Sequence, residues 1–163
     1  MTMVLRRAAF ADIPFIMACE RRPGYEPFVG RWPEEKHRVA MDAAAFCYLV
    51  ASDDEAPRGF AILHRSDMRP ENLYIKRVAV HDADGGHGRR LLTALNDWVF
   101  GQTDTHRFWL EVVEHNPRAR HIYESLGFVA EGVVREAYTV PDGTRASFIQ
   151  MSILKPDWTE GRA

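Results

Sequence analysis

An apolar segment that runs directly into a glycine-rich turn constrains this chain more than any other feature. Val78-Ala79-Val80 is typical of a strand, the turn after it contains Gly85, Gly86 and Gly88, and an amphipathic helix follows. The first turn of a helix has unpaired backbone N–H groups and the positive end of the helix dipole. Because glycines leave those groups uncovered, the segment is suited to binding a phosphate. A glycine-rich connection that binds nothing explains the same pattern.

Two common nucleotide-binding motifs fail at this turn. A P-loop needs Lys followed by Ser or Thr after its last glycine, and no glycine here is followed by that pair. A dinucleotide-binding turn needs a third glycine where Leu91 stands, and an acidic residue in a context that the next strand lacks. The turn therefore holds another kind of phosphate, or none.

Hydrophobic periodicity predicts alternating strands and helices along the whole chain. Strands are expected at 4–8, 46–51, 59–64, 73–80, 108–113, 128–138 and 146–154, and helices from Asp12, at 33–42, from the glycine turn to Gly101, and from Asn116 to Gly127. Short turns predict antiparallel hairpins for 46–64 and 128–154. The helix between 73–80 and 108–113 makes those two strands parallel. Residues 1–163 thus form one mixed α/β domain with a core of about 4–154 and a short polar C-terminal tail.

The composition fits an ordinary soluble protein, with 46% hydrophobic and 27% charged residues. A formal net charge of −2 gives no electrostatic reason to bind nucleic acid or an anionic membrane. No apolar run could span a bilayer and no signal segment is recognisable, so a cytoplasmic location is expected. Cys19, Cys47 and the histidines have no metal-like spacing, so no metal site is expected.

Two separated motifs, in the right order, resemble one family. Val78–Leu92 resembles the pyrophosphate-binding segment of the GCN5-related N-acetyltransferase (GNAT) family. Leu110-Glu111-Val112, followed by Asn116, Ala119, Tyr123 and Gly127-Phe128, resembles that family's second half, most of all in its ribosomal-protein and small-amine acetyltransferases. The resemblance covers roughly 4–154 and implies one N-acetyltransferase domain. Its fold would be a mixed, mostly antiparallel sheet with one parallel strand pair at the cofactor site, flanked by about four helices.

The resemblance implies acetyl-CoA as the acyl donor. Backbone amides would hold its pyrophosphate around Gly86, His87, Gly88, Arg89 and Arg90. The strand end at Val78 and Val80 would pair with the pantetheine arm and the acetyl carbonyl, in a splay between the two parallel strands. Asn116 would contact the cofactor from the cap of the next helix.

One position departs from the family pattern. The family favours Arg or Gln three residues before the first glycine of Gly-x-Gly, and Ala83 stands there. Asp82 and Asp84 also bring negative charge near a site meant for pyrophosphate, unless they point outward or cap the turn. Arg89 and Arg90 could offset that charge.

The resemblance also implies two catalytic residues. Alkylamines are mostly protonated at pH 7, so acetyl transfer needs a base for the amine and an acid for the departing thiolate. Glu111 corresponds to the general base of the ribosomal-protein members, and Tyr123 to the hydroxyl that protonates the thiolate. An ion pair with an arginine explains Glu111 without catalysis, and core packing explains Tyr123. Glu114 and His115 are rival bases at the end of the same strand.

The acceptor is expected on the face opposite the cofactor. The loop 21–33 carries aromatic residues, which loops usually lack. With residues from elsewhere they form the predicted acceptor set: Tyr25, Phe28, Trp32, Glu34 and Tyr138. Aromatic rings and carboxylates suit a cationic amine, although the same rings could simply hold the loop on the core.

The expected activity is direct transfer of an acetyl group to a primary amine of a small molecule or a protein N-terminus. The alternative is a non-catalytic acyl-CoA-binding module of the same fold that senses or recruits. Dimers are frequent in the resembled family, so a homodimer is a further expectation, but no segment of this sequence identifies an interface.

Overall fold

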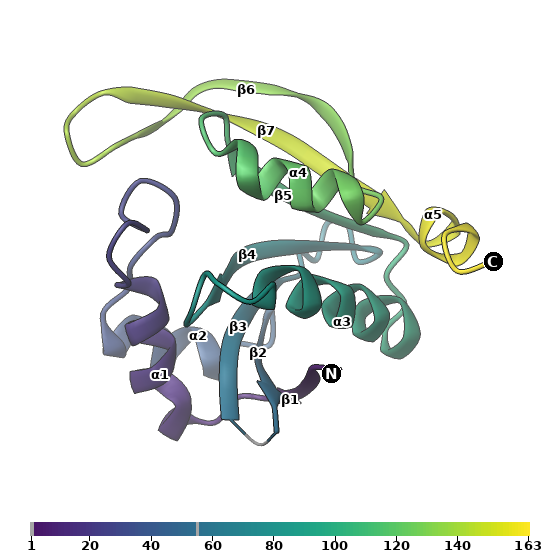
Figure 1. Cartoon of the computed structure of the whole chain (residues 1–163), viewed down its shortest axis with the longest axis horizontal. Coiled ribbons are helices and arrows are strands. Elements are labelled where there is room, and N and C mark those ends of the chain that lie inside the picture. Colours follow the sequence, from purple (N-terminus) through teal and green to yellow (C-terminus); the bar gives the residue numbers. More distant parts are fainter. Residues whose placement is uncertain (1, 55) are drawn as a thin grey trace.

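A seven-stranded sheet forms the centre of the chain in the computed structural model, which describes residues 2–54 and 56–163 (Figure 1). The strand order is β1-β2-β3-β4-β5-β7-β6. The strands are β1 Val4–Arg7, β2 Phe46–Asp53, β3 Ala56–His64, β4 Asn72–Val80, β5 Arg107–Val113, β6 Val129–Thr139 and β7 Arg145–Leu154. The helices are a 3-10 turn at Phe10–Asp12, α1 Ile13–Glu20, α2 Glu34–Asp42, α3 His87–Gln102, α4 Pro117–Ser125 and α5 Lys155–Glu160.

Neighbouring strands are antiparallel except for β4 and β5, which are parallel. This pair is joined only from Asn72↔Arg107 to Tyr74↔Trp109. β4 continues to Val80 and β5 to Val113, and no pairing joins their second halves within the described chain. The two strands therefore part in the middle of the sheet. The predicted mixed sheet with one parallel pair is confirmed.

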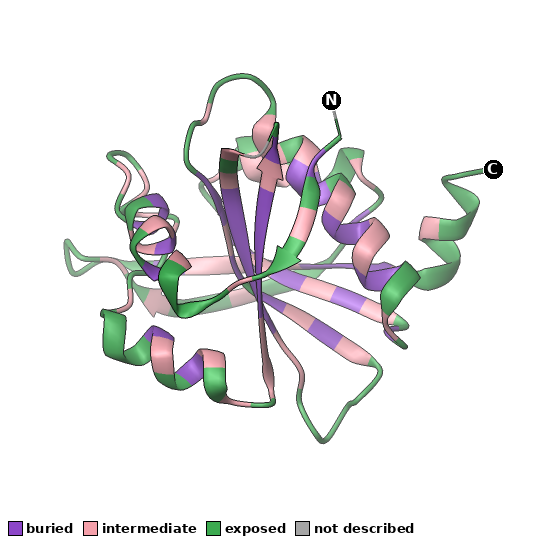
Figure 2. Cartoon of the chain, turned by 90° about the horizontal axis from the view of Figure 1, so that it is seen from below, coloured by how far each residue is buried: buried purple, intermediate pink, exposed green. Residues whose placement is uncertain are grey.

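Alternating side chains of β3 divide the core between the two faces of the sheet. Ala61 and Leu63 belong to one buried cluster with α3, and Phe60 and Ile62 belong to another with α1 and α2. This division follows from the two-residue period of a strand. The buried face of α3 consists of Leu91, Leu92, Leu95, Asn96, Val99 and Phe100. Figure 2 shows the buried central strands with helices on either side.

The C-terminal segment differs from the polar tail that the sequence predicted. Residues Lys155–Glu160 form α5, which follows β7 directly. Trp158 lies with its ring 5.6 Å from the Phe100 ring, and its indole N–H donates to Asp97 at 2.9 Å. One large aromatic side chain therefore docks this segment on α3. Of the helices described, none combines the length and apolar character that crossing a membrane requires.

Candidate active site

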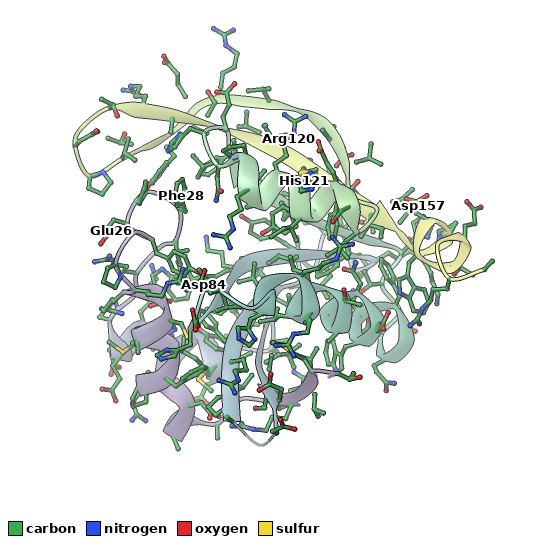
Figure 3. All side chains as sticks on the ribbon, viewed as in Figure 1. Glu26, Phe28, Asp84, Arg120, His121 and Asp157 are labelled. Atoms are coloured by element: carbon green, nitrogen blue, oxygen red, sulfur yellow. The ribbon has the colours of Figure 1, made fainter. Side chains whose placement is uncertain are left out.

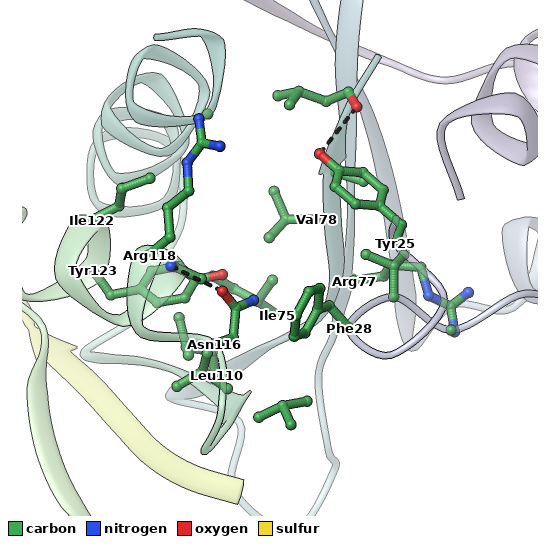
Figure 4. A pocket seen from close by; sticks show the side chains of 18 of the residues that line it. Tyr25, Phe28, Ile75, Arg77, Val78, Leu110, Asn116, Arg118, Ile122 and Tyr123 are labelled. Atoms are coloured by element: carbon green, nitrogen blue, oxygen red, sulfur yellow. Dashed lines mark hydrogen bonds between the residues drawn. The ribbon is translucent and has the colours of Figure 1, made fainter. Parts of the chain in front are cut away.

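The parting of β4 and β5 opens into a cavity of about 680 Å³ (Figure 4). Its walls come from both strands, the glycine turn, the start of α4, the loop 22–30 and the β6–β7 hairpin. The volume lies within the range of small-molecule and cofactor sites. Figure 1 shows the loop rising from α1 toward the hairpin, so one side of the opening is bounded by segments far apart in sequence.

The glycine turn presents bare backbone at one end of this cavity. Gly85 and Gly86 have φ of +81° and +70°, which favours glycine, and Gly86 is the N-cap of α3. A Cβ at Gly88 would meet no atom within 4 Å, and Gly86 and Gly88 both line the cavity. α3 has 16 residues, long enough to carry a full dipole. The turn therefore has the geometry of an anion site.

The two aspartates of the turn stay outside that site. Asp82 accepts a hydrogen bond from the backbone N–H of Asp84 at 3.0 Å, so it caps the turn. Both residues are exposed, and neither is among the residues that line the cavity. Figure 3 shows Asp84 on the turn that leads from β4 into α3. The carboxylates of Asp82 and Asp84, which the sequence suggested would oppose phosphate binding, are therefore not part of the cavity wall.

Three arginines surround the turn, and two of them were not anticipated from sequence. Arg118 donates to the carbonyl of Ala83 at 3.0 Å, and Arg89 donates to the Ser125 hydroxyl at 2.6 Å. Arg22 lies over the Tyr25 ring at 3.8 Å. Arg22, Arg89 and Arg118 all line the cavity. Arg118 of α4 and Arg22 of the loop therefore supply the positive charge that position 83 lacks. Both are far from the turn in sequence, so no local spacing predicts their position.

The predicted phosphate contacts of His87 and Arg90 involve their backbone N–H groups, and neither residue is among those that line the cavity. Arg90 contacts His87 Nδ1 at 2.6 Å and pairs with Asp53 at 3.2 Å. Its backbone N–H donates to the Gly86 carbonyl at 3.2 Å inside α3. The first-turn position of His87 still leaves its backbone N–H at the start of the helix. Arg90 therefore anchors the turn to β2.

The end of β4 turns polar backbone toward the cavity. The Val80 carbonyl accepts from the Tyr25 hydroxyl and from Arg22, both at 3.5 Å (Figure 4). At the opposite edge of β4, which faces β3, the backbone N–H of His81 donates to the carbonyl oxygen of Arg58 at 2.7 Å. Because successive residues of a strand direct their backbone groups to alternate edges, Val78 shares the edge of Val80. Both residues line the cavity.

Tyr123 of α4 lies in the cavity wall (Figure 4). Its side chain is 9% exposed and packs edge-on against Phe128, with ring centroids 5.6 Å apart. Burial, with a smaller contribution from Tyr25, raises the pKa of Tyr123 to about 12. The phenol is therefore protonated at neutral pH. Asn116 also lines the cavity, and its side chain accepts from the Ala119 N–H at 3.2 Å as the cap of α4.

Glu111 of β5 faces Tyr74 of β4 across the point where the strands part. The Tyr74 hydroxyl donates to Glu111 at 3.4 Å. Burial and the nearby Glu111 carboxylate raise the pKa of Tyr74 to about 12. The predicted alternative, an ion pair between Glu111 and an arginine, is absent from the described residues. The rival bases Glu114 and His115 are exposed and lie outside the cavity lining.

The predicted acceptor residues separate into two groups. Tyr25, Phe28 and Tyr138 line the cavity, and the structure adds Tyr74 and Phe148 to them. Trp32 and Glu34 do not line it. Trp32 lies under the guanidinium of Arg77 at 4.7 Å, and Glu34 pairs with Arg38 at 2.8 Å on α2. Trp32 therefore packs on a residue of the cavity wall, and Glu34 pairs with a neighbour on its own helix.

A buried polar network supports this wall and was missed from sequence. Glu20, fully buried at the end of α1, binds Arg77 at 2.7 Å and His37 at 3.1 Å. His37 also contacts the Tyr48 hydroxyl at 3.0 Å. Burial would raise the pKa of Glu20, but the hydrogen bond with His37 and the charge of Arg77 outweigh it and lower that pKa. The signal available in the sequence was Glu20 itself, the one acidic residue at the end of the apolar helix α1.

The chain matches the model described as the Acetyltransferase (GNAT) family over residues 15–128, more than half of its length. Spermidine N(1)-acetyltransferase of Vibrio cholerae serotype O1 is 36% identical over 78 residues, 48% of this chain and 44% of that protein. Ribosomal protein bS18-alanine N-acetyltransferase of Haemophilus ducreyi is 32% identical over 68 residues, 42% of this chain and 46% of that protein. Each match spans less than half of the relative.

Solved structures agree over almost the whole chain. The crystal structure of Vibrio cholerae spermidine N-acetyltransferase in complex with CoA and spermine has a TM-score of 0.84 at 22% identity, covering 97% of this chain and 98% of that one. The ribosomal-protein-S18-alanine N-acetyltransferase of Escherichia coli has a TM-score of 0.76 at 24% identity, covering 94% of each chain. The relatives' names agree with the predicted enzyme class and with acetyl-CoA as donor. The chain belongs to the GNAT family of acetyltransferases.

Proposed function

We propose that this chain is an acetyl-CoA-dependent N-acetyltransferase that transfers the acetyl group directly to a primary amine. The observation that carries the proposal is the cavity between β4 and β5, because it joins an anion-binding helix start to a protonated phenol and a carboxylate. Spermidine and the ribosomal-protein alanine, which the relatives' names give as acceptors, are both amines. A cytoplasmic location and a homodimer, both expected from the sequence, remain part of the proposal.

The cofactor would lie along the cavity with its pyrophosphate on the glycine turn. Backbone N–H groups at His87, Gly88 and Arg89 would bind the phosphates, as first-turn amides do. Charge-assisted hydrogen bonds from Arg22, Arg89 and Arg118 would strengthen that binding. The edge of β4 at Val78 and Val80 would pair with the pantetheine arm, for which the Tyr25 hydroxyl must release the Val80 carbonyl.

The protein residues would move two protons. Bound acetyl-CoA supplies a thioester carbonyl for attack and a thiolate as leaving group. Glu111 would take a proton from the ammonium of the acceptor, directly or through a water, so that the neutral amine can attack. Tyr123 would give its proton to the departing sulfur. A phenol with a pKa of about 12 holds that proton until the thiolate forms.

The described residues that line this cavity include no Cys, Ser or Thr to serve as the nucleophile of an acyl-enzyme route. Neither Cys19 nor Cys47 is among its lining residues. Burial raises the pKa of Cys19 to about 12 and also raises that of Cys47. Both thiols are therefore protonated at neutral pH and unreactive. This supports direct transfer.

A thiol-release assay tests the proposed activity. The purified protein is incubated with acetyl-CoA and a panel of primary amines, and free CoA thiol is measured alongside the acetylated amine by mass spectrometry. We expect amine-dependent thiol release with one acetyl group on the amine per thiol. A folded protein that binds acetyl-CoA but acetylates no amine in the panel would instead support the acyl-CoA-binding module.

A further inference from the structure

The charged residues of the cavity wall are unevenly distributed. Glu111 is the single acidic residue among those that line the cavity in the described chain. The lining cations are Arg22, Lys76, Arg77, Arg89 and Arg118. Two exposed acidic residues, Glu26 and Glu114, are not among the lining residues. Glu26 pairs with Arg31 at 3.4 Å, and Glu114 follows the end of β5. An acceptor with several ammonium groups would therefore meet one carboxylate and a surplus of positive charge.

The cations separate by position. Arg22, Arg89 and Arg118 contact Val80, Ser125 and Ala83, which places them at the cofactor end beside the glycine turn. Arg77 is buried and bound to Glu20 at 2.7 Å. The remaining lining cation, Lys76, lies in β4 beyond Tyr74, where the strands part. At the acceptor end the charged pair is thus Glu111 and Lys76.

Lys76 is presented to the cavity by an irregularity in β4. The pairing with β3 jumps from Ile62↔Arg77 to Leu63↔Ile75, so Lys76 is the extra residue of a bulge. Bulges commonly redirect a side chain next to a functional site. Among the described residues Lys76 forms no ion pair or hydrogen bond, and its ammonium nitrogen lies 6.0 Å from the centre of the Trp32 ring. Burial and the charges of Arg77 and Lys36 lower the pKa of Lys76, and the opposing charge of Glu111 offsets this only in part.

The rest of the acceptor wall is aromatic. It consists of Tyr25, Phe28, Tyr74, Tyr138 and Phe148. The ring centres of Tyr138 and Phe148 lie 5.6 Å apart on the β6–β7 hairpin. Phe28 comes from the loop 22–30 (Figure 3). Such a surface suits a molecule with an apolar or aromatic body. The complete wall therefore offers an aromatic surface, one carboxylate and one unpaired cation.

Resting on the proposed function, we propose that the acceptor is a monoamine with an apolar body that also carries an anionic group, as an aromatic α-amino acid does. Its ammonium approaches Glu111, its anionic group binds Lys76, and its body packs on the aromatic wall. A linear polyamine, by contrast, would bring a second ammonium toward Lys76. This acceptor class distinguishes the chain from the relative whose name specifies spermidine.

Three acceptors test the class in the thiol-release assay: phenylalanine, phenylalanine methyl ester and spermidine. The first two share the amine and the ring, and only phenylalanine has the anionic group. We expect phenylalanine to have a higher kcat/KM than spermidine. In Lys76→Met the ratio of kcat/KM for phenylalanine to that for the ester should fall about tenfold to a hundredfold, as for the loss of one charged hydrogen bond. Using this ratio within each variant cancels differences in amine basicity.

Lys36→Met is the matched control, because Lys36 lies over the Trp32 ring at 4.3 Å and outside the cavity lining. Its ratio should change far less than that of Lys76→Met, since Lys36 acts on Lys76 only through its charge at a distance. Preference for spermidine, or an unchanged ratio in Lys76→Met, would overturn the acceptor class and leave the proposed acetyltransferase intact. If the protein turned over acetyl-CoA neither with these three acceptors nor with any other amine of the panel, the proposed function itself would fail.

Discussion

The Tyr123 phenol is protonated at neutral pH, as an ordinary tyrosine is, and burial raises its pKa further to about 12. The role assigned to it is to transfer that proton to sulfur, and its hydroxyl is the part that matters. Tyr123→Phe keeps the ring that packs on Phe128 and removes only the hydroxyl. We expect kcat to fall by about 10²-fold or more, within the range of general acid catalysis, while the Kd for acetyl-CoA changes little. Steady-state kinetics and calorimetry measure the two effects, and an unchanged kcat would remove Tyr123 from the mechanism.

Glu111 is assigned a role that depends on the protonation of the acceptor. Glu111→Gln keeps a hydrogen-bond acceptor for Tyr74 and removes the base. We expect kcat/KM to fall about 10²-fold or more at pH 7, and the deficit to shrink as the pH rises toward the pKa of the amine, since the fraction of neutral amine then increases. A pH profile of both proteins measures this. A deficit that stays constant with pH would contradict a role as base.

At the scale of elements, the start of α3 and the start of α4 together make the phosphate end of the site. α3 supplies glycines and backbone N–H groups, and α4 supplies Arg118, which binds the carbonyl of Ala83. This arrangement accounts for the absence of Arg or Gln at position 83, because the charge comes from a different helix. The two helices follow different strands of the parted pair, so the site requires β4 and β5 to be in place.

Arg118→Ala should raise the Kd for acetyl-CoA about tenfold, the effect of removing one charged hydrogen bond. The matched control is Arg120→Ala on the same helix, where the side chain pairs with Glu124 at 2.8 Å and points away from the glycine turn (Figure 3). Calorimetric titration of both variants gives the two constants. Equal affinity in the two variants would place the phosphates away from Arg118.

At the scale of the whole molecule, the buried Glu20 network connects α1, α2 and β4 beneath the acceptor wall. Glu20→Gln leaves Arg77 without its buried partner, and we expect a loss of about 3–5 kcal/mol in the free energy of unfolding. Glu124→Gln, in an exposed pair with Arg120, should lose less than about 1 kcal/mol. Urea denaturation measures both, and similar losses in the two variants would contradict the importance of the network.

The same network predicts how stability depends on acid. The pKa of Glu20 is lower in the folded state than the unfolded value of about 4.3, so its contribution is fully present above that value. It is lost as the pH falls through the lowered folded pKa. Between pH 5 and pH 3 the unaltered protein should therefore lose more stability than Glu20→Gln does. Parallel curves for the two proteins would contradict this assignment.

The sequence predicted most of the fold because the signals involved are local. Hydrophobic periodicity, the Asn116-Pro117 helix start and the glycine turn are each decided within a few residues, and the parallel pair follows from chain connectivity. Contacts between distant segments were not predictable in this way. Arg118 reaching Ala83, Trp158 docking on Phe100 and Lys76 projecting from a bulge all depend on pairings that no local pattern specifies. Trp32 and Glu34 were assigned to the acceptor from their residue types and their place in or just after the loop, but Trp32 packs on Arg77 and Glu34 pairs with Arg38.

The central claim, that the parted strands hold acetyl-CoA on the glycine turn, is tested most directly by calorimetric titration of the unaltered protein and of Gly88→Asp. Gly88 lines the cavity, and a Cβ there would meet no other atom, so the variant should fold normally while placing a carboxylate at the phosphate position. The account predicts saturable binding of acetyl-CoA, no binding of ATP or NAD, and loss of acetyl-CoA binding in the folded variant. Normal acetyl-CoA binding by folded Gly88→Asp would contradict it.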